Sequence, residues 1–347
     1  MRKIPTDRPK GGPPWHVKDR LMKGKIMQDK ISACLLGGAM GDAMGADIEF
    51  WSLDQIRREG VRASDSITDD TQMTLFTAEG LIRARVRVAE RGICAPEAVV
   101  HHALLRWYVT QGGRPQMQVC DRGLITDPRL HRRRAPGLTC LSALAEATRF
   151  GEPALNDSKG CGTIMRVAPC ALIASDARQA EQLAHDTSAL THGHVLGIEA
   201  AVAQARILFE LLHGASLADA VGAVALSAPI MRALDAAMTA PDDGKPDTVE
   251  RLGEGWVAEE ALSIAVYAAR VGRDPDHGLR IAAIHSGDSD STAAIAGNLL
   301  GLLHSQQVLA TCPPLRERDL IEGVARDLTL ARADALSPDL SARYQGW

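Results

Sequence analysis

Aromatic residues are scarce in this chain: they make up 3% of its 347 residues, whereas hydrophobic residues as a whole make up 46%. β-Strands favour aromatic and β-branched side chains, and alanine, which is abundant here, has the highest helix propensity. A chain of this length and hydrophobic content can bury a large core. The composition therefore disfavours a β-sandwich or barrel and predicts an all-α fold.

The sequence also lacks paired cysteine motifs and long apolar runs. Its seven cysteines are odd in number and include no Cys-x-x-Cys pair, which disfavours a disulfide framework and a zinc site and indicates a reducing compartment. No apolar signal region stands at the N-terminus, and no apolar run is long enough to span a bilayer. We therefore expect a cytoplasmic protein without a membrane partner.

The charge is unevenly distributed. The net charge is −4 overall, but residues 1–30 hold nine Lys and Arg against three Asp. This segment is rich in proline and glycine and has little apolar periodicity, so we expect a basic, extended arm. Residues 31–347 show no break in composition and are expected to form one domain. Trp15, Leu21 and Met22 are apolar exceptions that could anchor the arm on its own domain or on a partner.

Apolar periodicity predicts helices along the rest of the chain. One begins near Ile31, where the small residues at 37–41 would let another backbone approach closely, and a second follows Thr71. Further helices are expected at 96–109, 139–149, 177–190, 194–213, 216–226, 256–270 and 292–304. The polar segment 239–255 is expected to be a loop.

Two polar clusters stand directly before apolar helices. Residues 66–71 include Asp69 and Asp70, and residues 285–292 include Asp288 and Asp290. Such residues are ordinary helix N-caps, but a cap needs one side chain and each cluster offers several. Like charges packed together are unfavourable unless a cation lies between them. Carboxylate and hydroxyl oxygens suit Mg²⁺, Mn²⁺ or Ca²⁺ rather than zinc.

The order of these motifs resembles the ADP-ribosylglycohydrolase (DraG-like) family, which includes the ADP-ribosylarginine hydrolases. The resemblance covers roughly residues 28–310. It rests on Gly-Ala-Met-Gly-Asp-Ala-Met-Gly at 38–45 with Glu49 behind it, Thr-Asp-Asp-Thr at 68–71, Gly-Cys-Gly-Thr-Ile-Met-Arg-Val-Ala-Pro at 160–169, Thr-His at 191–192, and Ser-Gly-Asp-Ser-Asp-Ser-Thr at 286–292. The five motifs occur in the order that the family shows.

The resemblance implies a compact, single-domain helical bundle around a binuclear metal centre that holds two Mg²⁺ or Mn²⁺ ions. The implied metal ligands are Thr68, Asp69, Asp70, Asp288, Asp290 and Ser291. Ser291 stands where many members have threonine, which keeps a hydroxyl ligand. The Asp-Ser-Asp-Ser variant and the segment 134–140 look more like the arginine-specific branch of the family than the serine-specific one.

The resemblance also implies which residues line the ADP-ribose cleft. The loop residues implied to do so are Gly160, Cys161, Gly162 and Thr163. Glycines let backbone N–H groups reach phosphate oxygens, although structural turns also use them. His192 could contact the adenosine end or be satisfied at a helix junction, and Trp256 could cover the sugar or base or belong to the core.

The implied reaction is hydrolysis of the N-glycosidic bond between ribose and a guanidinium nitrogen, with oxocarbenium character on the ribose. Two metal ions would hold the ribose hydroxyls and lower the pKa of a bound water, and a carboxylate would take its proton. The candidate carboxylates are Asp70 and Asp69, beside the metals, and Glu49, which stands where serine-specific members place theirs. For an arginine substrate the metal-site aspartate is favoured.

Other functions stay open. A binding or inhibitory protein would hold ADP-ribose without cutting it, although none of the six ligand positions departs from the family pattern, and a serine-linked substrate is a further alternative. The arm at 1–30 could bind an ADP-ribosyltransferase toxin whose action the enzyme reverses, as in a bacterial immunity protein. Nucleic-acid binding through the arm or through residues 131–134 is disfavoured by the acidic balance and the few aromatics.

Overall fold

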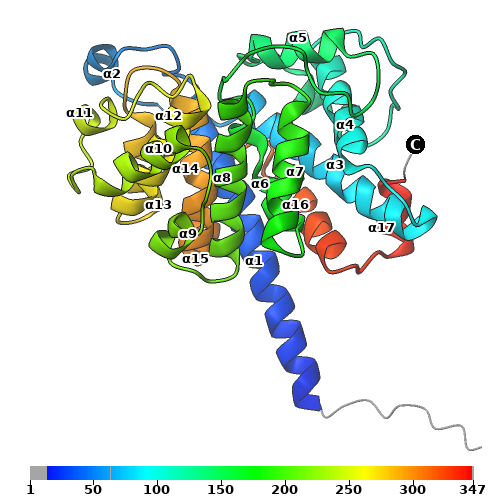
Figure 1. The fold of residues 1–347 in the computed structure, drawn as a ribbon. Coiled ribbons are helices and arrows are strands. Elements are labelled where there is room, and N and C mark those ends of the chain that lie inside the picture. The colour runs from blue at the N-terminus through cyan, green and yellow to red at the C-terminus, as the bar shows by residue number, and fades with distance from the viewer. Residues whose placement is uncertain (1–13, 63, 346–347) are drawn as a thin grey trace, which may run out of the picture.

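The computed structural model describes residues 14–345 apart from residue 63, and for residues 14–21 it describes the backbone alone (Figure 1). Within these residues the chain is helical and contains no strand; one isolated β-bridge joins Gly160 to Val257. The all-α prediction is confirmed. None of the helices in this part of the chain combines the length and apolar character needed to cross a membrane.

The elements follow one another along the chain as helices joined by short connections. The α-helices are α1 (Pro14–Gly45), α2 (Leu53–Glu59), α3 (Asp69–Arg91), α4 (Pro96–Thr110), α5 (Leu138–Glu146), α6 (Ala168–Ile173), α7 (Ala177–Ala189), α8 (Val195–Leu212), α9 (Leu217–Gly222), α10 (Ala228–Thr239), α11 (Pro246–Val249), α12 (Ala258–Val271), α13 (Pro275–Ala283), α14 (Ser289–Leu303), α15 (Ser305–Thr311), α16 (Arg318–Arg332) and α17 (Pro338–Arg343). The 3₁₀ helices are η1 (Leu124–Thr126), η2 (Pro128–His131) and η3 (Ile164–Arg166).

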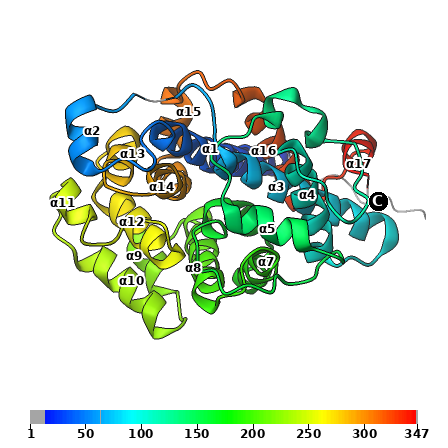
Figure 2. The same ribbon diagram turned by 90° about the horizontal axis from the view of Figure 1, so that it is seen from above.

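Helices α1 and α14 lie against each other at the centre of the bundle (Figure 2). A Cβ added at Gly41 would lie 1.9 Å from the carbonyl oxygen of Ala293, and one added at Gly45 would lie 2.3 Å from the backbone nitrogen of Asp290. Neither position has room for a side chain, so the two helices meet backbone to backbone. The predicted close approach at residues 37–41 is confirmed, and it fixes the first turn of α14 against the end of α1.

Helix α3 is buried along most of its length and carries an ion-pair network. Glu79 contacts Arg83 on the same helix and Arg106 on α4, each through an N–O distance of 2.8 Å. All three side chains are at most 3% exposed. Arg83 also donates to the backbone carbonyl of Gln345 at 2.7 Å, which attaches the end of the chain to α3.

The predicted helices at 96–109, 139–149, 177–190, 194–213, 216–226, 256–270 and 292–304 correspond to α4, α5, α7, α8, α9, α12 and α14. The predicted loop at 239–255 is interrupted by the single turn of α11. Besides α11, seven α-helices were not predicted: α2, α6, α10, α13, α15, α16 and α17. Elements of one or two turns show too little apolar periodicity to be identified, but α10 and α16 are 12 and 15 residues long and were missed as well.

The prediction of an extended N-terminal arm is wrong for residues 14–30, which lie in α1, while residues 1–13 lie outside the described residues. Pro14 occupies the first turn of the helix, where proline is well tolerated, and no proline follows it within α1. The N-terminal part of α1 projects from the body of the molecule (Figure 1). Because α1 spans residue 30, the division into an arm and a domain is not a boundary between elements.

Candidate active site

The two carboxylate clusters begin α3 and α14, and both contribute to one cleft. Thr68 is the N-cap of α3, and its hydroxyl accepts from the Asp70 N–H at 3.4 Å. Asp288 is the N-cap of α14, and its Oδ1 accepts from the Ser291 N–H at 3.3 Å. Ordinary capping therefore accounts for one side chain of each cluster, and the other aspartates are left for a second role.

The cleft has a volume of about 340 Å³, within the range of small-molecule sites. Its walls come from the turn after α1, the starts of α3 and α14, the segment 135–140, the loop 160–162 and Trp256. The predicted site residues in its lining are Glu49, Asp69, Asp70, Gly160, Cys161, Gly162, His192, Trp256, Asp288, Asp290 and Ser291. Residues far apart in the sequence are thus brought together, as the motifs predicted.

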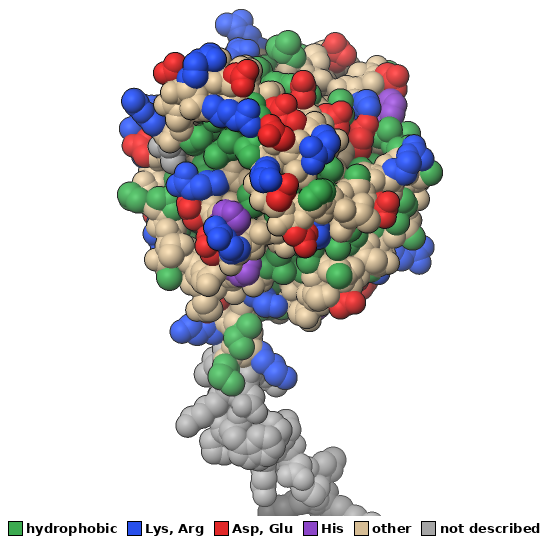
Figure 3. Space-filling view, turned by 90° about the vertical axis from the view of Figure 1, so that its left-hand side faces the viewer, with side chains coloured by type: hydrophobic (Ala, Val, Ile, Leu, Met, Phe, Trp, Pro, Cys, Tyr) green, Lys and Arg blue, Asp and Glu red, His purple; other side chains and the backbone are tan. Residues whose placement is uncertain are grey.

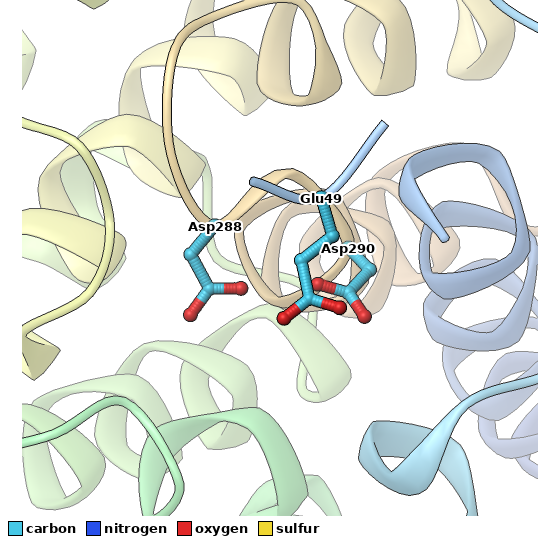
Figure 4. A group of neighbouring side chains, drawn as sticks. All are labelled: Glu49, Asp288 and Asp290. Carbon is cyan, nitrogen blue, oxygen red and sulfur yellow. The ribbon is translucent and has the colours of Figure 1, made fainter. Parts of the chain in front are cut away.

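Three carboxylates converge in the cleft. Glu49, Asp288 and Asp290 each offer an oxygen, and these atoms lie within 4.8 Å of one another. Figure 4 shows Glu49 reaching this group from the turn after α1, and the two aspartates from the start of α14. The sequence interpretation assigned Glu49 to the candidate bases, whereas the structure places it beside two of the predicted metal ligands.

Burial and mutual repulsion dominate the electrostatics of these groups. Burial, reinforced by neighbouring carboxylates, raises the pKa values of Asp69, Asp70 and Asp290 well above their usual range. Burial and then the charge of Asp288 raise the pKa of Glu49 to about 8. None of the salt bridges formed by the described residues includes any of these carboxylates. The cleft concentrates negative charge without a protein cation to balance it.

The donor atoms fit a hard divalent cation. Oδ1 of Asp70 is buried and has no hydrogen-bond partner among the described residues, and an unsatisfied buried polar atom costs about 1–3 kcal/mol. A cation among the carboxylates would satisfy this oxygen and offset their repulsion. Oxygen-rich sets of carboxylates and hydroxyls are the ligands that Mg²⁺, Mn²⁺ and Ca²⁺ accept.

Asp42 positions the start of α3, a role that the sequence interpretation did not assign. It is fully buried in α1, and its carboxylate accepts from the backbone N–H of Thr68 at 2.9 Å and of Thr71 at 3.0 Å. These bonds tie the turn that carries Asp69 and Asp70 to α1. Burial raises the pKa of Asp42 to about 6. The available signal was a lone aspartate on a helix face otherwise made of small and apolar residues.

The glycine-rich loop forms one wall of the cleft but uses some of its own N–H groups. The Cys161 N–H donates to the carbonyl of Trp256 at 3.2 Å, and the Gly160 N–H donates to the Ser158 hydroxyl at 3.3 Å. The Cys161 thiol donates to Oδ2 of Asp288 at 2.8 Å. These two backbone groups are therefore not free for a phosphate, and the loop's clearest contact is with the carboxylate group.

His192 is satisfied at a helix junction and also borders the cleft. It is 1% exposed at a helix junction, where its Nδ1 lies 2.9 Å from the Thr191 hydroxyl, and it also lines the cleft. Burial lowers the pKa of His192 to about 3, so the ring is neutral. Arg166 holds this wall together, because it donates to the Thr191 hydroxyl at 2.9 Å and to the Gly162 carbonyl at 3.0 Å. A contact between His192 and adenosine stays a prediction.

Two predicted residues lie outside the lining of the cleft. Thr163 is fully buried, and its hydroxyl donates to the carbonyl of Gly197 on α8. The threonine side chain therefore faces the core beside η3, and the substrate contact that the resemblance implies for Thr163 stays a prediction. Thr68 is 3% exposed and uses its hydroxyl as a cap, so its assignment as a metal ligand stays a prediction.

Trp256 belongs to the wall of the cleft. Its ring stacks on Phe50, with centroids 5.1 Å apart and planes inclined by 22°. Phe50 also lines the cleft and was not identified from the sequence. A single phenylalanine behind a glutamate gives no pattern that would distinguish it from a core residue.

Comparisons with known proteins agree with this description. The model of a family described as ADP-ribosylglycohydrolase matches residues 24–337. A relative from Archaeoglobus fulgidus, named only as an uncharacterized protein, is 25% identical over 328 residues that cover 87% of this chain and 96% of that protein. A solved structure titled "ADP-ribosylglycohydrolase-related protein complex" matches with a TM-score of 0.64 and 24% identity, covering 89% of this chain and 99% of that chain. The last comparison shows that the two share a fold.

Proposed function

This chain belongs to the ADP-ribosylglycohydrolase family, which implies hydrolysis of ADP-ribose linkages, and we propose that it releases ADP-ribose from arginine side chains of a modified protein with the help of two divalent cations. The observation that supports this proposal is the convergence of buried carboxylates without protein cations in one cleft. Hydrolysis requires an activated water, which cations held by this group would supply, whereas binding of ADP-ribose alone does not require one. The arginine linkage rests on the motif variants at 134–140 and 288–291.

The carboxylates of α3 and α14, together with the Ser291 hydroxyl, would hold the cations. When bound, Mg²⁺ or Mn²⁺ would supply positive charge that orients the ribose hydroxyls and lowers the pKa of a water molecule. Asp42 would keep the first turn of α3 in place through its bonds to Thr68 and Thr71. Preorganised side chains of this kind reduce the reorganisation that the reaction requires.

A carboxylate must also accept the proton of the attacking water. Asp70 is the best candidate, because it lines the cleft beside the other predicted metal ligands and no backbone N–H of the described chain donates to its carboxylate. Asp69 is less suited, since its Oδ2 already accepts from the Gly137 N–H at 3.3 Å. Glu49 lies in the turn after α1, is only partly buried, and shares its space with Asp288 and Asp290. We assign Asp70 as the general base.

The test is ADP-ribose release from an arginine-linked and a serine-linked protein substrate, each with Mg²⁺ and with EDTA. We expect metal-dependent release from the arginine-linked substrate alone. Release from the serine-linked substrate alone would contradict the proposed linkage. Binding of ADP-ribose without release from either substrate would favour the alternative of a binding or inhibitory protein.

A second role, binding of a protein partner through the N-terminal segment, is favoured by the projecting part of α1. Met22 and Ile26 are 61% and 51% exposed and lie four residues apart, on one side of the helix. Figure 3 shows hydrophobic and basic side chains together where the helix leaves the body. We propose that this segment binds an acidic surface on an ADP-ribosyltransferase toxin, as an immunity protein would.

Substitution of Met22 and Ile26 by glutamate tests this second role. We expect binding to such a transferase to be lost while ADP-ribose release is unchanged, because neither residue lines the cleft. Equal binding by the variant and the unaltered protein would contradict it.

A further inference from the structure

An aromatic pair, of which Phe50 is exposed and Trp256 is partly buried, stands in the lining of the cleft. Phe50 is 68% exposed although its ring stacks on Trp256. Its φ of 69° lies in the left-handed region, which costs a bulky residue about 1–3 kcal/mol and is commonly retained at functional sites. The exposed Phe50 ring gains little from burial, although its backbone conformation is unfavourable. Binding of a ligand to the pair would explain why this arrangement is kept.

The pair is built on the loops that carry the reactive carboxylates. Phe50 follows Glu49 directly, and its N–H donates to the carbonyl of Gly287 at 3.3 Å. Asp288, the next residue, donates its N–H to the carbonyl of Glu254 at 2.8 Å, two residues before Trp256. These bonds join the three segments, so the aromatic rings lie beside the end of the cleft where the carboxylates converge.

The charge around the pair favours a cationic ligand. Glu49 and Asp288 lie in the same cleft, and Glu254 is exposed close to Trp256. Another part of the lining, at 135–139, follows the basic segment 132–134 instead. Aromatic faces attract cations, and a planar guanidinium both stacks on a ring and bonds to carboxylates. A neutral nucleobase would stack equally well but would gain nothing from the acidic surroundings.

We propose that Phe50 and Trp256 bind the guanidinium group of the modified arginine and so determine specificity for an arginine-linked substrate. This inference rests on the proposed function, because it concerns the leaving group of that reaction. A serine-linked substrate carries no planar cation at this position. The pair contacts the leaving group on binding, so it contributes mainly to substrate affinity and less to the chemical step.

The experiment measures the binding of agmatine, a free guanidinium compound, by calorimetry to the full-length protein saturated with ADP-ribose and Mg²⁺. Cadaverine, which carries an ammonium group in place of the guanidinium, is the matched probe. Phe50→Ala should raise the Kd of agmatine about fivefold or more, the range of a partly desolvated cation–π contact. It should raise the Kd of cadaverine by a smaller factor, because an ammonium group does not stack on the ring. Trp256→Phe, which keeps an aromatic face, should retain most of the agmatine affinity.

Ile93→Ala is the control variant, because Ile93 is 76% exposed and does not line the cleft. It should leave agmatine binding unchanged. In turnover of an arginine-linked substrate, Phe50→Ala should raise KM with little change in kcat.

Agmatine affinity that is the same with and without Phe50 would overturn this inference, and arginine-linked turnover by the unaltered protein would then leave the proposed function standing. An equal fall in the affinities for agmatine and ADP-ribose would also overturn it, since the pair would then be a nucleobase site. Absence of arginine-linked turnover would remove the proposed function and this inference with it.

Discussion

Two acidic groups on the same helix, α3, differ in whether their buried charge is balanced by the protein. In the middle of α3, Glu79 is balanced by Arg83 and Arg106, both buried with it. At the start of α3, Asp69 and Asp70 are as deeply buried, at 3% exposure each, yet no salt bridge in the described chain includes them. The first group is balanced within the protein, whereas the second would be balanced by a cation from solution under the proposed function.

We attribute the paired group around Glu79 to the stability of the fold and the unpaired group, Asp69 and Asp70, to function. A paired buried charge contributes to a unique fold, and removal of one partner leaves the other charge unbalanced. Unpaired carboxylates destabilise the folded protein, so their retention points to a site at which ligand binding matters more than stability. Asp42 holds the turn that carries Asp69 and Asp70 in place, because its carboxylate accepts from the backbone of Thr68 and Thr71.

The largest expected effect comes from neutralising one of the unpaired carboxylates of the cleft, on α3 or at the start of α14. Asp70→Asn and Asp288→Asn should each lower ADP-ribose release by about 10²–10⁴-fold, the usual contribution of a positioned acid or base. Without metal, both variants should unfold at a denaturant concentration no lower than the unaltered protein, because one repelling charge is removed. Asp47→Asn, at an exposed position in the turn after α1, is the control. Near-normal turnover by either site variant would refute the assignment of the metal site.

Removal of the Glu79 carboxylate from the paired group should instead lower the stability of the protein and leave its turnover nearly unchanged. Glu79→Ala leaves two buried arginines without their carboxylate, so the free energy of unfolding should fall by about 3–5 kcal/mol, measured by urea denaturation. Turnover per folded molecule should stay within a few fold of normal, because Glu79 does not line the cleft. Glu90→Ala, at an exposed acid on the same helix, should change stability by less than about 0.5 kcal/mol. Equal effects of the two substitutions would contradict the structural role of the network.

Metal binding should stabilise the protein through the unpaired group alone. At a Mg²⁺ concentration about 100-fold above Kd, the free energy of unfolding should rise by about 2.7 kcal/mol, seen as a higher Tm than in EDTA. The gain should shrink in Asp70→Asn and persist in Glu79→Gln. A Mg²⁺ effect that is unchanged in Asp70→Asn would place the ion elsewhere.

The smallest effect concerns the strained residue beside the unpaired group. Phe50→Gly and Phe50→Ala both remove the ring, but glycine adopts a φ of 69° without the Cβ clash that alanine suffers. The glycine variant should therefore be more stable than the alanine variant by about 1 kcal/mol, measured as a difference in Tm. Equal stability of the two variants would show that Phe50 does not hold this conformation in solution.

Long helices such as α8 and α14 could be predicted from apolar periodicity, whereas α10 and α16, of 12 and 15 residues, were missed. The start of α3 and the start of α14 were identified from acids and hydroxyls directly before apolar runs. The helical conformation of residues 14–30 was missed, because most of the prolines and glycines that predicted an extended arm stand before residue 14. Pro14 lies at the one place in α1 where it favours the helix.

The site could be predicted only in part, because some of its geometry depends on contacts between distant segments. Asp69 and Asp288 were recognised from local redundancy, since each cluster has more polar groups than a cap needs. The grouping of Glu49 with Asp290 depends on the backbone contact at Gly45, where α1 meets α14. The strained conformation of Phe50 gives no signal at all, because left-handed backbone is predicted from glycine or asparagine.

The most direct test of the central claim is a count of the divalent cations that the protein binds, by electron paramagnetic resonance during a Mn²⁺ titration. We expect two Mn²⁺ ions per chain in the unaltered protein and in Glu79→Gln, and fewer in Asp70→Asn and Asp288→Asn. No bound Mn²⁺ in the unaltered protein, or full binding in both aspartate variants, would contradict it.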